Sequence, residues 1–425
     1  MKKVLLIAFY FNQTNEIASK RLRGLGKYLQ EYGWEPIVLI PDLNEKNTEN
    51  LNCKIIKTPY TDMIEKWMPG KKENNVPKTQ IKNSNDTNNK FLSKIISIAG
   101  EIFAYPDGMK YWYEPAITES SKIIEEYHID AIISSSFPIT AHLIGQELKN
   151  KYNIPWIADL RDLWNMNPYI NHTFIRNYFE KKLEIKTLKD ADALTTTTEL
   201  AKEKLLTLHP QQKIIPILNG YEADEIKTLP EKLENKKLTI TYAGSLYSGK
   251  RNPEILFKAI NELIEDGKIK SDKISLNFYG DKGNLEYLKN KYNLNSVVHI
   301  NGFIPHNEVL LKQNQSDILL LISWNNPKEE IFIPGKVYEY MALKRPIISI
   351  GYKKGSLKDL IDKTGIGIHT SDIDILKEGI MKYYEEFILN GKLEFKAKKD
   401  IEEYSINNMA SEFSKLLNNI SNIEE

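Results

Sequence analysis

The sequence predicts an α/β protein made of two doubly wound domains, each with a parallel β-sheet covered by helices on both faces. Three observations lead to this expectation. The chain has 425 residues, and about 150 residues per domain gives two or three domains. Short apolar runs alternate with longer segments of helical periodicity. The alternation restarts after a polar stretch, Glu222–Lys237, so we expect the two halves to meet near Asn219-Gly220.

The first half opens with a strand and a helix. Val4–Phe9 is apolar and predicts a buried strand, and the periodicity from Ile17 to Tyr32 predicts a helix. Gly33 is placed to end that helix in a left-handed conformation. Glu35–Ile40 predicts the second strand. Further strands of this half are expected at Ala131–Ser134, Pro155–Ala158, Ala193–Thr197 and Ile214–Leu218.

The second half repeats the pattern with strands of similar length. They are expected at Leu238–Ala243, Ile274–Tyr279, Val297–Ile300, Ile318–Ile322, Pro346–Ile350 and Gly367–Thr370. At the end of the chain, Ser405 is a candidate helix N-cap. The apolar residues of that helix recur on one face, which must pack against one of the two domains: Met409, Phe413, Leu416, Leu417 and Ile420.

Composition excludes several classes of protein. The formal net charge is +1, so no global basic field favours nucleic acid. The single cysteine, Cys53, excludes an intramolecular disulfide and a CxxC metal site. Val4–Ala8 is too short for a signal peptide, and no apolar run approaches the ~18 residues of a membrane span. We therefore expect a cytoplasmic protein.

Two adjoining segments interrupt the alternation. Residues 69–90 are rich in Asn, Lys, Thr and Pro, which predicts a mobile insertion. Residues 91–104 carry apolar side chains at helical spacing. This helix either packs on its own domain or dips into a membrane interface. Trp67, Trp112 and Tyr113 would suit a headgroup level, but they would equally suit a core.

Ligands of open α/β sheets bind at the carboxyl ends of the strands. After the first strand of the second half, Gly244 and Gly249 permit close approach of a ligand to the backbone, and Lys250 and Arg251 precede a helix. A helix N-terminus with two cations suits a diphosphate. The alternative is a solvated turn with surface cations.

A second candidate follows the Ile318–Ile322 strand. Gly335 and Lys336 open a helix, and their backbone N–H groups could meet phosphate oxygens. Glu339 lies one turn further and could accept the hydroxyls of a ribose. An ordinary amphipathic helix with an exposed glutamate is the alternative.

In the first half, Asp159, Arg161 and Asp162 follow a strand and form a dense polar cluster. A structural ion-pair network is the alternative to a catalytic role. His142 lies near the start of the helix that follows Ser134-Ser135-Ser136, and a lone helical histidine is more often structural.

Together these segments resemble the bacterial retaining glycosyltransferases of family 4, which have the GT-B fold, and especially the surface-polysaccharide subgroup. The resemblance is carried by Phe137-Pro138 with His142, Asp159 to Trp164, Asn219-Gly220-Tyr221, Tyr242-Ala243-Gly244 through Arg251, and Pro334 to Ala342. They occur in the order found in the family.

The resemblance implies an acceptor-binding domain at 1–218, a nucleotide-sugar domain at 219–404, and a last helix, about 405–421, that crosses back to the first domain. Lys250 and Arg251 would neutralise the donor's diphosphate, and Glu339 would hold its ribose. No metal or other cofactor is implied. The chain departs from the wider family at Ile331, where many members have a glutamate, and in the first loop, which lacks the usual glycine pair. It departs again at Ser135-Ser136, where many have a histidine.

The resemblance therefore implies a hexosyltransferase that moves a sugar from a UDP- or GDP-sugar to a saccharide acceptor in capsule, lipopolysaccharide O-antigen or exopolysaccharide assembly. We expect the acceptor to be carried on a polyprenyl diphosphate. Asp159, Asp162 or His142 would assist the acceptor hydroxyl. A peripheral position on the inner face of the membrane would suit such an acceptor. Two rival hypotheses are a nucleotide-sugar 2-epimerase and a non-catalytic nucleotide-sugar-binding scaffold. A Rossmann dehydrogenase is a weak third, since no glycine fingerprint follows the first strand.

Overall fold

The structure, a computed structural model, describes residues 1–12, 17–43, 51, 53–61 and 105–421. The chain divides into two compact units. The first holds Met1–Thr197, Ala201–Ile217 and the chain from Ala410 onward, and the second holds Thr198–Leu200 and Leu218–Met409. The expected insertion at 69–90, the helix at 91–104 and Trp67 lie outside the described residues.

The first unit is built on a seven-stranded sheet with the order β3-β2-β1-β4-β5-β6-β7, and every pair of neighbours is parallel. The interior strand β1 (Lys2–Ile7) is apolar from Val4 on because helices cover both faces of the sheet. The other strands are β2 (Trp34–Pro41), β3 (Lys54–Thr58), β4 (Ala131–Ser135), β5 (Trp156–Leu160), β6 (Ala193–Thr196) and β7 (Ile214–Pro216). Its helices are α1 (Ile17–Tyr28), α4 (Tyr113–Tyr127), α5 (Thr140–Tyr152), α6 (Phe174–Leu188) and α7 (Glu199–Leu208).

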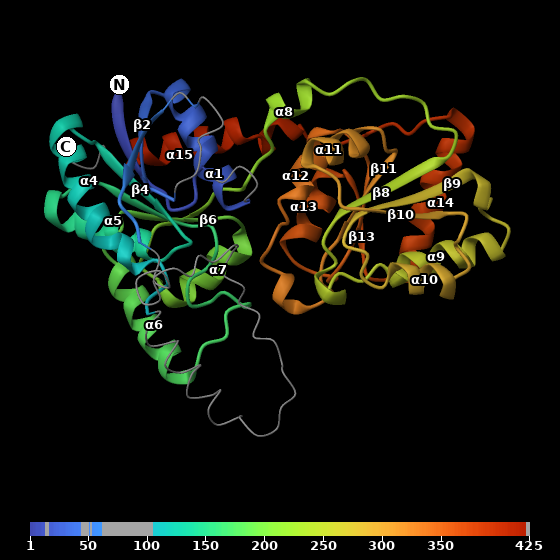
Figure 1. Ribbon diagram of the computed structural model, residues 1–425, viewed down its shortest axis with the longest axis horizontal. Coiled ribbons are helices and arrows are strands. Elements are labelled where there is room, and N and C mark those ends of the chain that lie inside the picture. Colours follow the sequence, from blue (N-terminus) through green and yellow to red (C-terminus); the bar gives the residue numbers. More distant parts are fainter. Residues whose placement is uncertain (13–16, 44–50, 52, 62–104, 422–425) are drawn as a thin grey trace. The chain divides into compact units, whose positions relative to one another are not determined.

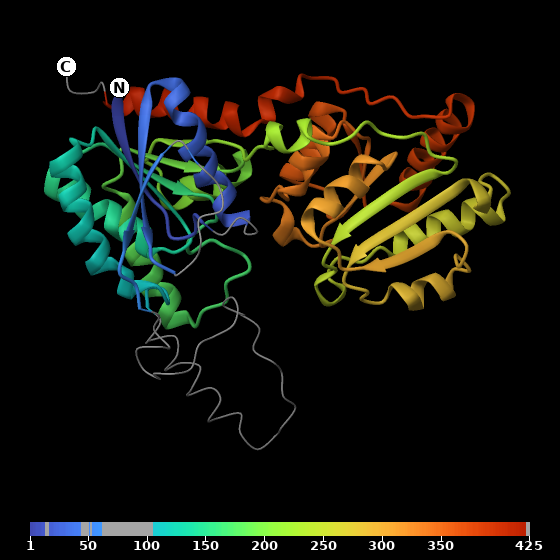
Figure 2. The same cartoon turned by 45° about the horizontal axis from the view of Figure 1, so that its top comes forward.

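The strand order explains how these helices are distributed. The chain winds outward from β1 to β3 and then returns to β4 on the other side of β1. Because parallel crossovers are right-handed, the return places later helices on the opposite face from α1. Figures 1 and 2 show α15 (Ile406–Ser421) beside α1, with α4 and α5 across the sheet. Gly33 has the left-handed conformation that the sequence predicted, with φ of 87°.

The second unit has a six-stranded parallel sheet with the order β10-β9-β8-β11-β12-β13. Its strands are β8 (Leu238–Gly244), β9 (Ile274–Gly280), β10 (Val298–Gly302), β11 (Ile318–Ile322), β12 (Ile347–Ile350) and β13 (Gly367–Thr370). Its helices are α8 (Ala223–Lys227), α9 (Glu254–Glu265), α10 (Leu285–Lys291), α11 (His306–Asn314), α12 (Lys336–Ala342), α13 (Ser356–Thr364) and α14 (Ile373–Asn390). The predicted fold class, two doubly wound parallel-sheet units, is confirmed.

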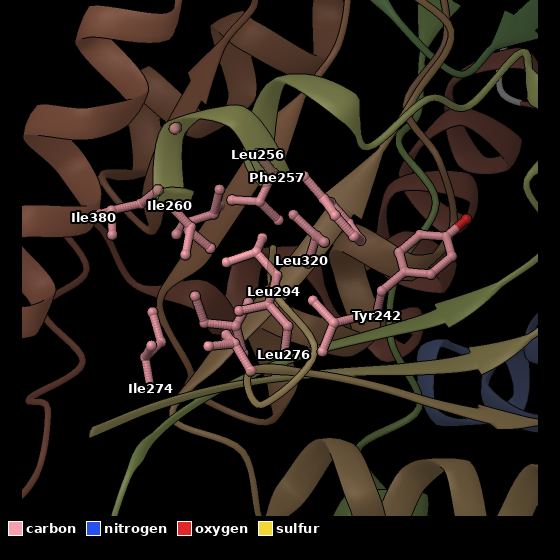
Figure 3. Close-up of a cluster of buried hydrophobic side chains, with 14 of the residues drawn as sticks. Tyr242, Leu256, Phe257, Ile260, Ile274, Leu276, Leu294, Leu320 and Ile380 are labelled. Atoms are coloured by element: carbon pink, nitrogen blue, oxygen red, sulfur yellow. The ribbon is translucent and has the colours of Figure 1, made fainter. Parts of the chain in front are cut away.

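Two apolar layers cover the second sheet, one on each face. Leu320 of β11 points into the layer formed with α9 and α14, whereas Leu319 and Leu321 point into the layer formed with α12 and α13. This alternation is the period of two that a strand imposes on its side chains. Figure 3 shows the first layer, in which Phe257 and Ile260 of α9 lie among the side chains of the strands.

The last helix packs on the first unit. Ser405 caps it as the sequence predicted, accepting a hydrogen bond from Asn408 N at 3.1 Å. From Ala410 onward the helix clusters with the first unit. Asn418 Oδ1 accepts a hydrogen bond from Trp34 Nε1 at 3.1 Å. The ring of Phe413 lies 4.9 Å from the Arg21 guanidinium carbon.

Arg21 also makes a fully buried ion pair with Asp159. Its Nε donates to Asp159 Oδ2 at 3.0 Å, and its second terminal nitrogen lies 3.0 Å from Asp159 Oδ1. Ser135 and Thr195 donate to the same carboxylate, each at 2.7 Å. Burial opposes ionisation of Asp159, but Arg21 and these hydroxyls outweigh it and lower the pKa of the carboxyl. One acid thus joins α1 to three neighbouring strands.

Phe257 is buried in the second unit. Phe257→Ala is expected to lower the free energy of unfolding by about 3–5 kcal/mol, because it leaves a large cavity in the apolar layer. Urea denaturation followed by circular dichroism measures this loss. Phe303 lies in the same unit but is 80% exposed, so Phe303→Ala serves as the control and should change stability by less than about 0.5 kcal/mol. Equal losses for the two variants would contradict the described packing.

Removing Arg21 should leave the charge of Asp159 buried without its cation, and Arg21→Ala is expected to cost about 3–5 kcal/mol. Because the pKa of Asp159 is lowered by folding, the stabilisation is present above its unfolded pKa and is lost as the pH falls through the folded value. Stability of the wild type should therefore fall in acid more steeply than that of Arg21→Ala. Arg161→Ala, which breaks a more exposed pair, is the control and should cost less than about 1 kcal/mol.

Candidate functional site

The second unit offers a binding edge where its strand order reverses. β8 lies between β9 and β11, so the chain winds away from β8 in both directions. This is the switch point at which ligands of open α/β sheets bind. The loop from Gly244 to Arg251 begins there, and the segment that follows β11 reaches the same edge. Gly244 has φ of 151°, a backbone conformation that favours glycine, and Lys336 Nζ occupies the place where a Cβ would stand.

A cluster of two cations and one acid lies at this edge, formed by Arg251, Lys336 and Glu339. Lys336 Nζ donates a hydrogen bond to the carbonyl of Ala243. Burial and the nearby positive charge of Arg251 together lower the pKa of Lys336 to about 8, against the opposing effect of Glu339. These three of the six predicted donor residues are therefore close enough to act on one another electrostatically. We call them the cation cluster.

Tyr242 anchors the cluster from β8. Its side chain is hydrogen-bonded to Arg251, and burial raises its pKa to about 12 although Arg251 acts in the opposite direction. Its hydroxyl donates to the carbonyl of Ser245 at 2.8 Å. Tyr242 was part of the family resemblance, but sequence reasoning gave it no role. A large polar side chain at the end of a strand was the available signal.

The loop after β8 is fixed by Asp281, which sequence reasoning missed. Asp281 Oδ2 accepts hydrogen bonds from Ser245 Oγ at 2.6 Å and from Leu246 N at 2.8 Å. Asp281 directly follows β9, so the rule that led to Gly244 would have led to it as well. Gly280, just before it, has φ of 120° and packs against the backbone of Gly244. These contacts hold the loop in one conformation.

Lys250 and Arg251, although adjacent, point to different neighbours. Arg251 lies over the ring of Tyr247, with its guanidinium carbon 4.4 Å from the ring centroid, and Lys250 Nζ lies 5.1 Å from the ring centroid of Trp324. Trp324 follows β11, so both cations remain at the same edge of the sheet. Arg251 belongs to the cation cluster, and Lys250 is more exposed.

Helix α12 carries the acid of the cluster. It begins at Lys336, with Gly335 as its N-cap residue, and Glu339 lies in its first turn. Val337, Tyr338 and Tyr340 are buried, whereas Glu339 is half-buried. The apolar face of the helix therefore packs on the sheet and leaves Glu339 at the accessible edge.

The segment before α12 carries the departure noted at Ile331. Ile331 is buried, as an apolar side chain should be. The carboxyl group of the neighbouring Glu329 is largely buried, and burial raises its pKa to about 7. At neutral pH it exchanges a proton readily and can donate or accept a hydrogen bond.

In the first unit, the expected cluster of two acids around Arg161 is wrong. Asp159 pairs with Arg21 and is fully buried, whereas Arg161 pairs with Asp162 at 2.9 Å. The physical reason is that Asp159 lies within β5 and points towards α1, while Arg161 lies beyond the end of the strand. The arrangement favours a structural role for Asp159. Asp162, with 33% of its side chain exposed, stays available to a ligand.

His142 is fully buried in α5. Its Nδ1 lies 2.8 Å from Ser134 Oγ, and its ring stacks on Trp164 with centroids 6.4 Å apart. Burial lowers the pKa of His142 to about 4 although Asp159 acts in the opposite direction, so the imidazole is neutral at pH 7. Its Nε2 is buried and has no hydrogen-bond partner among the described residues. These contacts favour a structural position.

Two kinds of feature are absent from the described residues. No group of three or more His, Cys, Asp or Glu side chains there is arranged to hold a metal ion. Within the same residues, no helix combines the length and apolar character needed to cross a bilayer.

Comparison with known proteins gives a family match for the second unit. Residues 237–386 match the family model of group 1 glycosyl transferases, a span that includes the whole cation cluster. No curated protein sequence matches the chain.

Solved structures extend the similarity to the whole chain. A glycosyltransferase from Rickettsia africae superimposes with a TM-score of 0.59 at 13% identity and covers 99% of both chains. Anabaena HepE in complex with UDP-glucose gives 0.57 at 10% identity, covering 99% of this chain and 100% of its own. UDP-GlcNAc 2-epimerase from Methanocaldococcus jannaschii gives 0.50 at 12% identity, with 99% and 100% covered.

These similarities show the fold, which is GT-B as the resemblance implied. The family match supports glycosyl transfer in general and does not extend to the first unit. The chain therefore has the GT-B fold, and its second unit resembles the group 1 glycosyl transferases over the span that holds the cation cluster.

Proposed function

We propose that this protein is a retaining glycosyltransferase that moves a sugar from a UDP- or GDP-sugar to a saccharide acceptor, one carried on a polyprenyl diphosphate, in capsule, O-antigen or exopolysaccharide assembly. The supporting observation is the cation cluster, in which Arg251, Lys336 and Glu339 meet at the switch point of a group 1 glycosyltransferase domain.

The cation cluster has the chemistry that a nucleotide diphosphate requires. Arg251 and Lys336 are held close together although their charges repel, so an anion between them would relieve the repulsion. Lys250 adds a third positive charge at the same edge. Glu339 accepts hydrogen bonds and would hold the hydroxyls of the ribose. HepE, of the same fold, was solved with UDP-glucose, which supports a nucleotide sugar as the donor.

The proposed reaction breaks the bond between the sugar and the diphosphate. Negative charge grows on the departing phosphate, and the sugar becomes oxocarbenium-like. Preorganised cations stabilise that transition state, each donor contributing about 2.7–4 kcal/mol in a dry site. The acceptor hydroxyl attacks from the face that the diphosphate leaves, and a phosphate oxygen takes its proton. Basic side chains carry the leaving-group charge, so this mechanism uses no metal ion.

On the acceptor side, we assign the contact to Arg161 and Asp162. Both are partly exposed beyond the end of β5. Arg161 would bind a phosphate of the acceptor, and Asp162 would orient its hydroxyl. Asp159 and His142 are buried and hydrogen-bonded within the first unit, so we assign them to holding the sheet edge in place.

A 2-epimerase is the second candidate, because an epimerase shares the fold. An epimerase acts on the nucleotide sugar alone, whereas a transferase needs an acceptor. The family match over residues 237–386 favours transfer.

The lowered pKa of Lys336 predicts how donor binding depends on pH. Bound diphosphate favours the protonated amine, so affinity for UDP-glucose or GDP-mannose should weaken as the pH rises through about 8, by at most about tenfold per pH unit. Isothermal titration between pH 7 and 9.5 measures this dependence. Lys336→Arg should bind with little dependence on pH, and Lys336→Gln should bind weakly at every pH. A wild-type affinity that stays constant over the range would contradict the role of Lys336.

Turnover distinguishes the candidate functions. The protein is incubated with a panel of UDP- and GDP-sugars, with and without lipid-linked saccharides, and nucleotide release and lipid-extractable sugar are measured. Transfer should appear only with acceptor, with retained anomeric configuration by NMR. Arg251→Ala and Glu339→Ala should each lower it by about 10²–10³-fold, while Lys258→Ala, an exposed change on α9, should not.

An epimer formed from the donor alone would instead assign the protein to the epimerases. Tight donor binding without transfer to any acceptor would favour a non-catalytic scaffold.

A further inference from the structure

Helix α6 of the first unit has an unusual distribution of side chains. Three of its charged residues, Arg176, Glu180 and Glu184, are buried, and its aromatic residues face outward. Arg176 and Glu180 form a buried ion pair at 2.9 Å, and Glu180 also accepts a hydrogen bond from Trp164 Nε1 at 2.6 Å. Glu184 accepts one from Asn165 N at 3.0 Å. A surface helix ordinarily has the opposite arrangement.

The outer face of α6 combines apolar and basic residues. Large apolar side chains dominate the first half of the helix: Phe174 is 86% exposed, Ile175 70%, Tyr178 50% and Phe179 53%. Exposed lysines follow at Lys181, Lys182, Lys186 and Lys189. We call these eight residues the α6 patch. In Figure 1, α6 lies at the lower edge of the first unit.

The α6 patch has one sign of charge. The only acids of α6 are Glu180 and Glu184, and both are buried and paired inward. None of the four lysines forms an ion pair with a carboxylate in the described part of the chain. The adjoining rings of Tyr178 and Phe179 lie 5.6 Å apart, and Lys182 Nζ lies 4.5 Å from the Tyr178 ring centroid. Apolar and basic groups therefore form one continuous surface.

We propose that the α6 patch docks this protein on a bilayer that contains anionic lipid. Exposed aromatic and aliphatic side chains gain by entering the boundary between headgroups and acyl chains, and lysines on the same face bind the anionic headgroups. A protein partner would satisfy the apolar residues, but four unpaired lysines without a single exposed acid on the helix complement a uniformly negative surface.

The α6 patch belongs to the first unit and the cation cluster to the second, and the two share no residue. The inference goes beyond the proposed function and does not depend on it, because its test uses no nucleotide sugar. If both hold, the enzyme and a lipid-linked acceptor share one surface. Failure of vesicle binding would leave the donor site untouched, and failure of donor binding would leave the α6 patch untouched.

The test is flotation of the full chain with two kinds of vesicle. One contains phosphatidylcholine alone, and the other also contains about 30% of the anionic lipid phosphatidylglycerol. Wild-type protein should float with the anionic vesicles, and raising the salt should weaken the binding. The double variant Phe174→Ser/Ile175→Ser should lose at least about tenfold in partitioning, since both side chains would insert. Lys181→Glu/Lys182→Glu should lose at least as much on anionic vesicles.

Matched controls keep the result specific. Phe303 and Leu389 are 80% and 83% exposed in the second unit, so Phe303→Ser/Leu389→Ser removes the same kind of surface elsewhere and should bind as wild type does. Equal flotation of wild type and Phe174→Ser/Ile175→Ser would overturn the proposal. A wild-type protein that does not float with the anionic vesicles would also overturn it.

The same variants would also reveal two other possible partners of the α6 patch. Concentration-dependent dimers that Phe174→Ser/Ile175→Ser abolishes, without vesicle binding by wild type, would assign the patch to a second copy of the chain. A lowered melting temperature of the same variant, again without vesicle binding, would assign it to a contact within the chain. Either result would overturn the membrane proposal and identify that partner instead.

Discussion

The proposed chemistry depends on one electrostatic constraint, which is that Arg251 and Lys336 are held near each other at the end of β8. Burial and the charge of Arg251 keep the pKa of Lys336 near 8, so in the free protein the charged form of this amine is destabilised. An anion placed between the two cations removes that penalty. The repulsion in the free protein thus becomes affinity for a diphosphate, and it becomes most valuable when the leaving group gains charge.

The fold creates this constraint by its topology. At the switch point, the chain winds away from β8 and from β11 in opposite directions, which is where ligands of open α/β sheets bind. Gly244 lets the side chain of Lys336 reach the backbone of β8, and Asp281 fixes the loop that carries Arg251. The apolar layers beneath hold the strands in register. In the first unit, the buried Asp159 of β5 binds side chains from α1, β4 and β6 and so links these elements.

Most of the architecture could be predicted from the sequence because it follows from local periodicity. The continuous apolar runs predicted the buried parallel strands, and Gly33 and Ser405 marked helix ends through their own backbone and side-chain chemistry. The edge strand β3 was not predicted, since Lys54–Thr58 alternates too weakly to stand out.

The candidate site was predictable only in part. Strand ends indicated Gly244, Arg251 and Glu339, because the position of a strand end can be read locally. The partner of Asp159 could not be read locally. Arg161 is its neighbour in sequence, yet Arg21, 138 residues away, is its neighbour in space. Long side chains such as those of Lys336 and Arg21 take directions that tertiary packing decides. The inverted face of α6 depends on the same packing and has no sequence signal of its own.

The most direct measurement is proton uptake on donor binding. Calorimetry of UDP binding at pH 8.5 in two buffers of different ionisation enthalpy gives the number of protons taken up per site. The cation cluster predicts net uptake by the wild type that disappears in Lys336→Arg, since arginine is already charged at that pH. Binding of UDP without proton uptake, or equal uptake by Lys336→Arg, would contradict the claim that Arg251 and Lys336 together form the diphosphate site.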